Sequence, residues 1–225
     1  MRIHRVLAGV VTAMLPCFAP AQQDTLKEIE RYRQLLQESN PAELYEARGE
    51  DLWKTRRGPK NASLERCDLG LGPGVVKGAY VRLPRYFADT DRVQDAESRG
   101  MTIAPPMSHP KERLAYQAGE RLFYYRAGPY DFGCVTCHGD EGKRIRLQSL
   151  PKMDNAKDAQ RAFGTWPAYR VSEGELRSMQ WRMWECIRQM RFPELEFASD
   201  ASIALIMFLA KRAEGGTFDA PAIKR

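Results

Sequence analysis

The stretch that decides the fold is "YDFGCVTCHGDEGK", residues 130–143, near the middle of a 225-residue chain. It holds two cysteines three positions apart and a histidine directly after them: Cys134, Cys137 and His138. C-x-x-C-H is the attachment sequence of c-type haem, because two thiols at this spacing add to the two vinyl groups and the histidine binds the iron. The motif therefore predicts one covalently bound haem with His138 as an axial ligand.

Two other interpretations of the motif are less well supported by the rest of the chain. Zinc needs four ligands, and outside the motif and the N-terminal leader only His109, Cys67 and Cys186 remain, widely scattered. A thioredoxin-like dithiol belongs in a βαβ pattern, which the sequence does not show. Haem is the favoured interpretation, and a redox dithiol is the alternative.

Residues 1–21 have the pattern of a secretory signal peptide. Two arginines precede an apolar run over 6–19, and Ala19-Pro20-Ala21 follows with small residues typical of a cleavage site. The run is too short to cross a bilayer, and no other stretch approaches a spanning length. We therefore expect cleavage after about Ala21, an exported mature protein and no membrane span.

The charge of the chain excludes one class of partner. Removing the two leader arginines takes the net charge from +6 to +4. This mild excess suits an acidic docking partner or an inorganic anion. Lys/Arg blocks interleaved with aromatic residues are absent from the sequence, so a nucleic-acid partner is not expected.

The chain contains two similar segments. "GEDLWKTRRGP" at 49–59 matches "GERLFYYRAGP" at 119–129 in Gly, Glu, Leu, Arg, Gly and Pro. Such self-similarity indicates duplication of a structural unit. We expect a mainly α fold made of two cytochrome c-like halves, 22–110 and 111–225, joined across the proline-rich "APPMSHP".

The second copy contains the haem motif, and the first copy has lost it. "CDLGLG" at 67–72 aligns with "CVTCHG", so Cys67 matches Cys134. Gly70 and Leu71 then stand where a second cysteine and a histidine would be needed. The first half is predicted to be a decayed haem site, and the second half binds the only haem.

The helices expected beyond the motif follow from apolar spacing and capping residues. One helix is predicted over 174–191 with Ser172 as its N-cap and Pro193 beyond its end. Another begins after Ser199 or Asp200 and stops at the glycines 215–216. The segment 143–150 is expected to be a loop, and no strand signal of comparable strength appears.

The ligand on the second side of the iron is left open by spacing alone. The candidates are His109, in a proline-bounded loop, several methionines, and Cys186 on the apolar side of the 174–191 helix. Arg182 lies one turn before Cys186 on the same helix face, where a guanidinium lowers a thiol pKa and holds oxyanions. A buried inert thiol and a solvated arginine remain the alternatives for these two residues.

Three segments together resemble one known family. They are "CVTCHGDEGKRI" from Cys134, "LRSMQWRMWECIRQMRFPE" around Cys186, and the C-terminal "ASIALIMFLAKRAEGGTFDAPAIKR". The chain is similar to the SoxA family, cytochrome c subunits of L-cysteine S-thiosulfotransferase in the periplasmic thiosulfate-oxidising system. The resemblance runs from about residue 30 to the C-terminus.

The resemblance implies a set of roles and partners. It makes His138 and Cys186 the two axial ligands of one haem, Cys186 the catalytic sulfur, often as a persulfide, and Arg182 its anion-binding partner. The implied reaction couples thiosulfate oxidatively to a cysteine of the SoxYZ carrier protein, giving a cysteine S-thiosulfonate, and electrons pass to the small cytochrome c SoxX in the periplasm.

The chain departs from the dihaem members of the family in its first half, and two other functions are considered for it. Dihaem relatives have a C-x-x-C-H in both halves, so this chain resembles a single-haem variant with an unpaired Cys67. A plain periplasmic electron-transfer cytochrome c would have a methionine or histidine ligand and an inert Cys186. A thiosulfate dehydrogenase making tetrathionate would share the ligand pair and lack a protein carrier.

Overall fold

The computed structural model describes residues 19–38, 40–79, 82–88, 91–94, 102–145 and 148–224. The chain divides into two units, 1–39 and 40–225. The described part of the first unit is helix α1 (Ala19–Glu38). The predicted signal peptide and its arginines lie almost wholly outside the described residues and stay a prediction. Within the described part of the chain, no helix is long and apolar enough to cross a membrane.

The second unit is mainly helical, as the sequence predicts. Its helices are α2 (Ala42–Lys54), the short 3-10 helix η1 (Leu64–Arg66), α3 (Pro110–Tyr124), α4 (Cys134–His138), α5 (Ala156–Phe163), α6 (Met179–Gln189) and α7 (Asp200–Arg212). Helix α2 is anchored at its start, where the Asn40 side chain donates to the carbonyl of Pro221 at 2.7 Å. The Tyr45 hydroxyl on the same helix donates to the Gly174 carbonyl.

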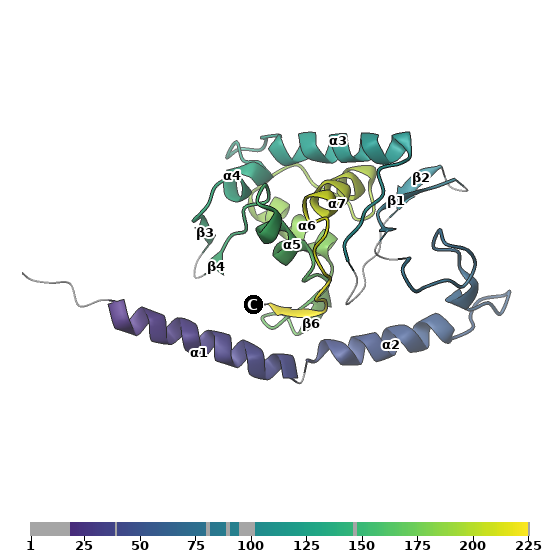
Figure 1. Ribbon diagram of the computed structural model, residues 1–225, viewed down its shortest axis with the longest axis horizontal. Helices are drawn as coiled ribbons and strands as arrows, with labels where there is room; N and C mark the ends of the chain where they lie inside the picture. The colour runs from purple at the N-terminus through teal and green to yellow at the C-terminus, as the bar shows by residue number, and fades with distance from the viewer. Residues whose placement is uncertain are drawn as a thin grey trace, which may run out of the picture. The chain divides into compact units, whose positions relative to one another are not determined.

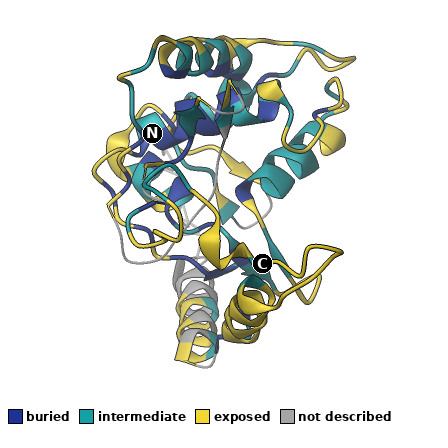
Figure 2. Ribbon diagram, turned by 90° about the vertical axis from the view of Figure 1, so that its right-hand side faces the viewer, coloured by how far each residue is buried: buried dark blue, intermediate teal, exposed yellow. Residues whose placement is uncertain are grey.

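Helices α3 and α7 pack against each other, with α3 along the upper edge in Figure 1. A Cβ atom at Gly119 of α3 would lie 1.9 Å from the carbonyl oxygen of Ala204 in α7, so only glycine permits this approach. Helix α7 is buried over most of its length, with Ile206 and Met207 fully covered (Figure 2, dark blue). Helices α5 and α6 pack against α7, and α4 packs against α3.

The N-terminus of α3 explains the role of His109. Its Nδ1 accepts from the backbone N–H of Lys111, and the buried Glu112 carboxylate accepts from the His109 backbone N–H at 2.9 Å. The ring also stacks on Tyr86 at 3.8 Å between centroids. This capping box fixes where α3 begins. His109 is thus a capping residue, which removes it from the candidate iron ligands.

Helix α7 confirms the prediction for 200–215, and α6 corrects the one for 174–191. Ser199 caps α7 by accepting from the N–H of Ser202. The cap of α6 is Ser178, which accepts from the N–H of Trp181 at 3.2 Å. Ser172 instead lies in the turn between two strands, so the predicted N-cap was wrong and the helix starts later.

The structure also contains short strands, for which the sequence shows no signal as strong as those of the helices. β6 (Glu175–Arg177), β5 (Ala168–Arg170) and β7 (Ala222–Lys224) form a three-stranded sheet in which β5 pairs antiparallel with β6 and parallel with β7. Two hairpins are added by β1 (Arg85–Phe87) with β2 (Arg92–Gln94), and by β3 (Arg144–Ile145) with β4 (Gln148–Ser149). The last pair lies in the segment predicted as loop.

The two segments that are similar in sequence end in the same turn. After α2, residues 57 and 62 exchange backbone hydrogen bonds, and after α3 residues 127 and 132 do the same. The glycine that follows each helix has positive φ in both copies, 69° at Gly58 and 75° at Gly128. Equivalent positions in the sequence thus adopt equivalent backbone conformations.

Candidate haem-binding site

The motif residues lie on α4, a single turn and a half of helix that follows α3. Gly133 precedes it, and a Cβ there would lie 2.4 Å from the carbonyl oxygen of Tyr125. Gly139 follows it, and a Cβ there would lie 2.7 Å from the carbonyl oxygen of Val135. Glycines on both sides therefore let the chain fold tightly around the two thiols and the imidazole.

The imidazole of His138 is oriented by a backbone carbonyl. Its Nδ1 lies 2.8 Å from the carbonyl oxygen of Pro151. A carbonyl oxygen can only accept, so Nδ1 carries the proton and donates. Nε2 is then left with a free lone pair, the arrangement that a metal-binding histidine requires. Burial lowers the pKa of His138, with the Pro151 bond opposing and the positive charge of Arg182 adding to this shift, so the ring is neutral.

The thiols of the motif and of α6 are partly buried, and their charges influence one another. Burial, together with negative charge on Cys186, raises the pKa of the Cys134 thiol to about 12. Burial also raises the pKa of Cys186, while Arg182 lowers it and Cys137 raises it. Each thiol therefore lies within electrostatic reach of the others, although α4 and α6 are far apart in sequence.

The donor set fits a c-type haem. Helix α4 supplies two thiols and one neutral imidazole with its Nε2 lone pair available, and Cys186 of α6 is close enough for its charge to influence the pKa of Cys134. Apolar side chains surround them, since Cys134 and Val135 of α4 pack against the buried core together with Met183 and Ile187 of α6. Among the described residues no group of carboxylates, cysteines and histidines suits a metal ion bound by the protein alone.

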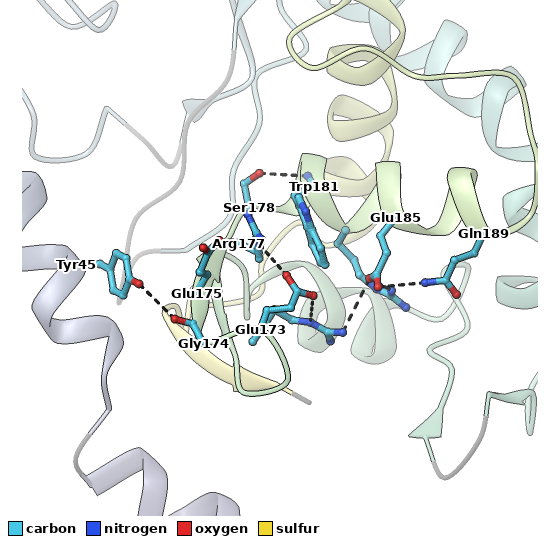
Figure 3. A network of polar contacts seen from close by, with 11 residues as sticks. Tyr45, Glu173, Gly174, Glu175, Arg177, Ser178, Trp181, Glu185 and Gln189 are labelled. Atoms are coloured by element: carbon cyan, nitrogen blue, oxygen red, sulfur yellow. Dashed lines mark hydrogen bonds and ion pairs between the residues drawn. The ribbon is translucent and has the colours of Figure 1, made fainter.

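A network of charged side chains lies beside Cys186 on α6. The Glu185 carboxylate accepts from Arg182 at 2.8 Å and from the Gln189 amide at 3.1 Å. Figure 3 shows Trp181, Glu185 and Gln189 projecting from α6, with Glu173 below them. Arg170, at the end of β5, approaches Glu185 to 3.9 Å. An anion that reaches Cys186 would thus meet two arginines and one carboxylate.

The remaining candidates lie elsewhere or have structural contacts. Cys67 is an exposed free thiol on the loop after η1. Arg188 is exposed on α6 and rests on the Trp184 ring, its guanidinium carbon 5.3 Å from the centroid. The methionines Met179 and Met183 pack in or against the core. Sequence reasoning did not identify Pro151, Arg170 and Glu185, and only the position of Glu185 next to Cys186 offered a signal for one of them.

The fold and the donor set define the class of protein as a c-type cytochrome. A family model described as SoxA/TsdA, cytochrome c domain, matches residues 48–103, within the half that lacks the motif. The structure titled "Crystal structure of SoxXA from P. pantotrophus" aligns with a TM-score of 0.70 at 19% identity, covering 87% of this chain and 84% of that one. The cytochrome c-like fold is thereby confirmed.

Two curated relatives identify the family. The L-cysteine S-thiosulfotransferase subunit SoxA of Hydrogenophilus thermoluteolus is 44% identical, and the match covers 95% of this chain and 94% of the relative. A subunit of the same name from Hydrogenobacter thermophilus is 30% identical, with 98% and 97% covered. The chain belongs to the SoxA family of L-cysteine S-thiosulfotransferase subunits. A transferase function is therefore confirmed in preference to a plain electron-transfer cytochrome or a thiosulfate dehydrogenase.

Proposed function

We propose that this chain binds one haem covalently through Cys134 and Cys137, with His138 and Cys186 as the two axial ligands, and that Cys186 and Arg182 form its catalytic site. The proposal is supported by the position of Arg182 one turn before Cys186 on α6, and by the influence of the Arg182 charge on the pKa of both His138 and Cys186. A plain electron-transfer cytochrome needs no arginine there. A cation beside a sulfur ligand is what a sulfur anion substrate would require.

The proposed reaction joins thiosulfate to a cysteine of the SoxYZ carrier protein. The carrier thiol loses its proton, a bond forms between its sulfur and the terminal sulfur of thiosulfate, and two electrons leave. The product is a cysteine S-thiosulfonate. A c-type haem, when bound, supplies a one-electron acceptor, and a second cytochrome is therefore needed to complete the two-electron oxidation.

The residues of this chain have three tasks in that reaction. Arg182 attracts the dianion and holds a sulfonate oxygen by a charged hydrogen bond. The sulfur atom of Cys186 contacts the terminal sulfur of the substrate and stays on this chain. His138, fixed by the Pro151 carbonyl, keeps the opposite side of the site rigid.

The partner cytochrome is proposed to be SoxX and the compartment the periplasm. The solved relative is titled SoxXA, which names such a complex for that protein. The signal peptide pattern at 1–21 and the carrier-bound reaction agree with an exported enzyme. The mild positive charge predicted for the mature chain would favour an acidic surface on either partner.

The first half is proposed to be a haem-less copy of the second. Its loop is closed by Asp68, whose carboxylate accepts from the N–H groups of Gly70 and Gly72 at 2.6 and 2.9 Å. A Cβ at Gly70 would lie 2.9 Å from the Arg85 guanidinium, and its φ is 88°. A cysteine at position 70 would therefore be strained, which supports a single haem.

Replacing Cys186 by serine tests the proposal. We expect the haem to stay attached, since attachment uses only Cys134 and Cys137, and thiosulfate coupling to the carrier to be abolished. The low-temperature electron paramagnetic resonance spectrum should lose the signature of thiolate-ligated ferric haem. Cys67→Ser, at an exposed thiol, is the control and should keep both. Normal coupling by Cys186→Ser would contradict the proposal and favour electron transfer alone.

A further inference from the structure

Arg170 is a largely buried cation with one hydrogen-bond donor, Nε, that has no partner. Its side chain is 13% exposed. Its Nε atom is buried and has no hydrogen-bond partner. The nearest carboxylate oxygens lie 3.8 Å from Nε, on Glu173, and 3.9 Å from Nη2, on Glu185. Both distances exceed a hydrogen bond.

The Arg170 guanidinium is positioned by contacts that do not use its Nε donor. Its central carbon lies 5.7 Å from the centroid of the Trp181 ring, within cation–π range. Arg177 lies over the same ring at 4.9 Å, yet it also forms ion pairs with Glu173 at 2.8 Å and Glu175 at 2.7 Å. Arg177 therefore forms close ion pairs with two carboxylates. Arg170 stacks on the same ring but has no carboxylate within hydrogen-bond distance.

Arg170 shares one carboxylate with the arginine of the proposed catalytic site. Oxygen Oε2 of Glu185 lies 2.8 Å from Arg182 and 3.9 Å from Arg170. Glu185 immediately precedes Cys186, so both guanidiniums are placed beside the same stretch of α6.

A buried guanidinium with unmade hydrogen bonds is costly unless a ligand completes them. A buried charged donor without a partner carries a desolvation penalty. An anion offsets this penalty by accepting hydrogen bonds from the N–H groups. The planar fork of arginine matches two oxygens of one oxyanion. The sulfonate end of thiosulfate offers three such oxygens, more than Arg182 can bind alone.

We propose that Arg170 is a second oxyanion-binding residue, which together with Arg182 holds the sulfonate end of thiosulfate beside Cys186. Glu185 is then a positioning residue that keeps the two guanidiniums apart and oriented. This inference rests on the proposed function, since it names a further residue for the same substrate. The N–H groups of Arg170 would also donate to a carboxylate of the haem. The experiment distinguishes thiosulfate from a haem carboxylate as the bound oxyanion.

The test compares Arg170→Gln with Arg177→Gln in the haem-loaded protein. Thiosulfate is titrated calorimetrically without carrier, and coupling kinetics are measured with SoxX-type cytochrome and carrier. For Arg170→Gln we expect thiosulfate affinity to fall about tenfold to a hundredfold, and KM to rise accordingly. Arg170→Lys should recover part of the affinity, since it keeps the charge without the fork. Arg177→Gln should change neither quantity, and the paramagnetic resonance spectrum without thiosulfate should be unchanged in all three.

Each other result has a definite meaning. Unchanged affinity and KM in Arg170→Gln would overturn the proposal. An altered haem spectrum with unchanged thiosulfate affinity would overturn it as well and assign Arg170 to a haem carboxylate. If the unmodified protein binds thiosulfate, loses that binding in Arg170→Gln, and yet never couples it to the carrier, the anion site stands and the proposed reaction fails.

Discussion

At the scale of single residues, the site depends on how α6 presents Arg182. The guanidinium lies one turn before Cys186, donates to Glu185 and is 26% exposed. Partial exposure lets an anion from solvent reach it, while the fixed carboxylate holds it in one orientation. Arg188, further along the same helix, is exposed and rests on a tryptophan ring.

Arg182→Ala should therefore reduce turnover much more than Arg188→Ala. Losing a hydrogen bond to a charged group costs about 1.5–3 kcal/mol, a tenfold to hundredfold decrease in kcat/KM. The haem absorption spectrum should change little in either variant. Steady-state coupling of thiosulfate to the carrier measures the effect. Equal rates in the two variants would assign Arg182 to the solvated helix surface.

The sequence predicts some of the proposed site residues because their signals are local. Cys134, Cys137 and His138 form one contiguous motif, and Arg182 and Cys186 share one helix face. Pro151 and Arg170 could not be identified in this way. Pro151 orients the imidazole from a loop thirteen residues away, and Arg170 reaches α6 only because β5 pairs with strands on both sides.

At the scale of elements, helices with clear ends were predictable and short strands were not. Ser199 and the glycines 215–216 delimit α7, and both signals act within the helix itself. The strand β5 has only three residues and is stabilised by β7, at the far end of the chain. Because that pairing is non-local, the sequence gives no sign of it and predicts a helix from residue 174. Helix α6 starts only at Met179.

Glycines at equivalent positions of α2 and α3 should respond to alanine with opposite signs. In α3, a Cβ at Gly119 would collide with backbone atoms of α7, and overpacking of this kind costs about 1–3 kcal/mol. In α2, a Cβ at Gly49 would meet nothing within 4 Å. Gly49→Ala should therefore stabilise by about 0.5–1 kcal/mol through helix propensity.

Urea unfolding of the haem-loaded protein, followed by circular dichroism, measures both changes. The two variants have the same substitution chemistry, so the difference between them reports the α3–α7 contact alone. A destabilisation by Gly49→Ala as large as that by Gly119→Ala would show that α2 has a packing partner in solution.

At the scale of the whole molecule, α2 and α3 are followed by the same turn, but the segments after that turn differ. After α3 the chain forms α4 with its thiols, whereas after α2 it forms η1 and a loop closed by Asp68. Arg85 donates to the carbonyl of Gly70 and fills the space beside it. The domain boundary at 110 stays a prediction, since residues 40–225 form one compact unit.

The last prediction is that the exported protein contains one covalent haem, attached only in the second half. Intact-mass measurement of the purified chain should show a single haem adduct on a polypeptide beginning near residue 22. Replacing Cys134 and Cys137 by alanine should remove the adduct, because thioether bonds need both thiols. Cys67→Ala should leave it in place, and the exposed Cys67 thiol should react with one equivalent of an alkylating reagent in the native protein. Two adducts, or an adduct lost in Cys67→Ala, would show that the first half still binds haem.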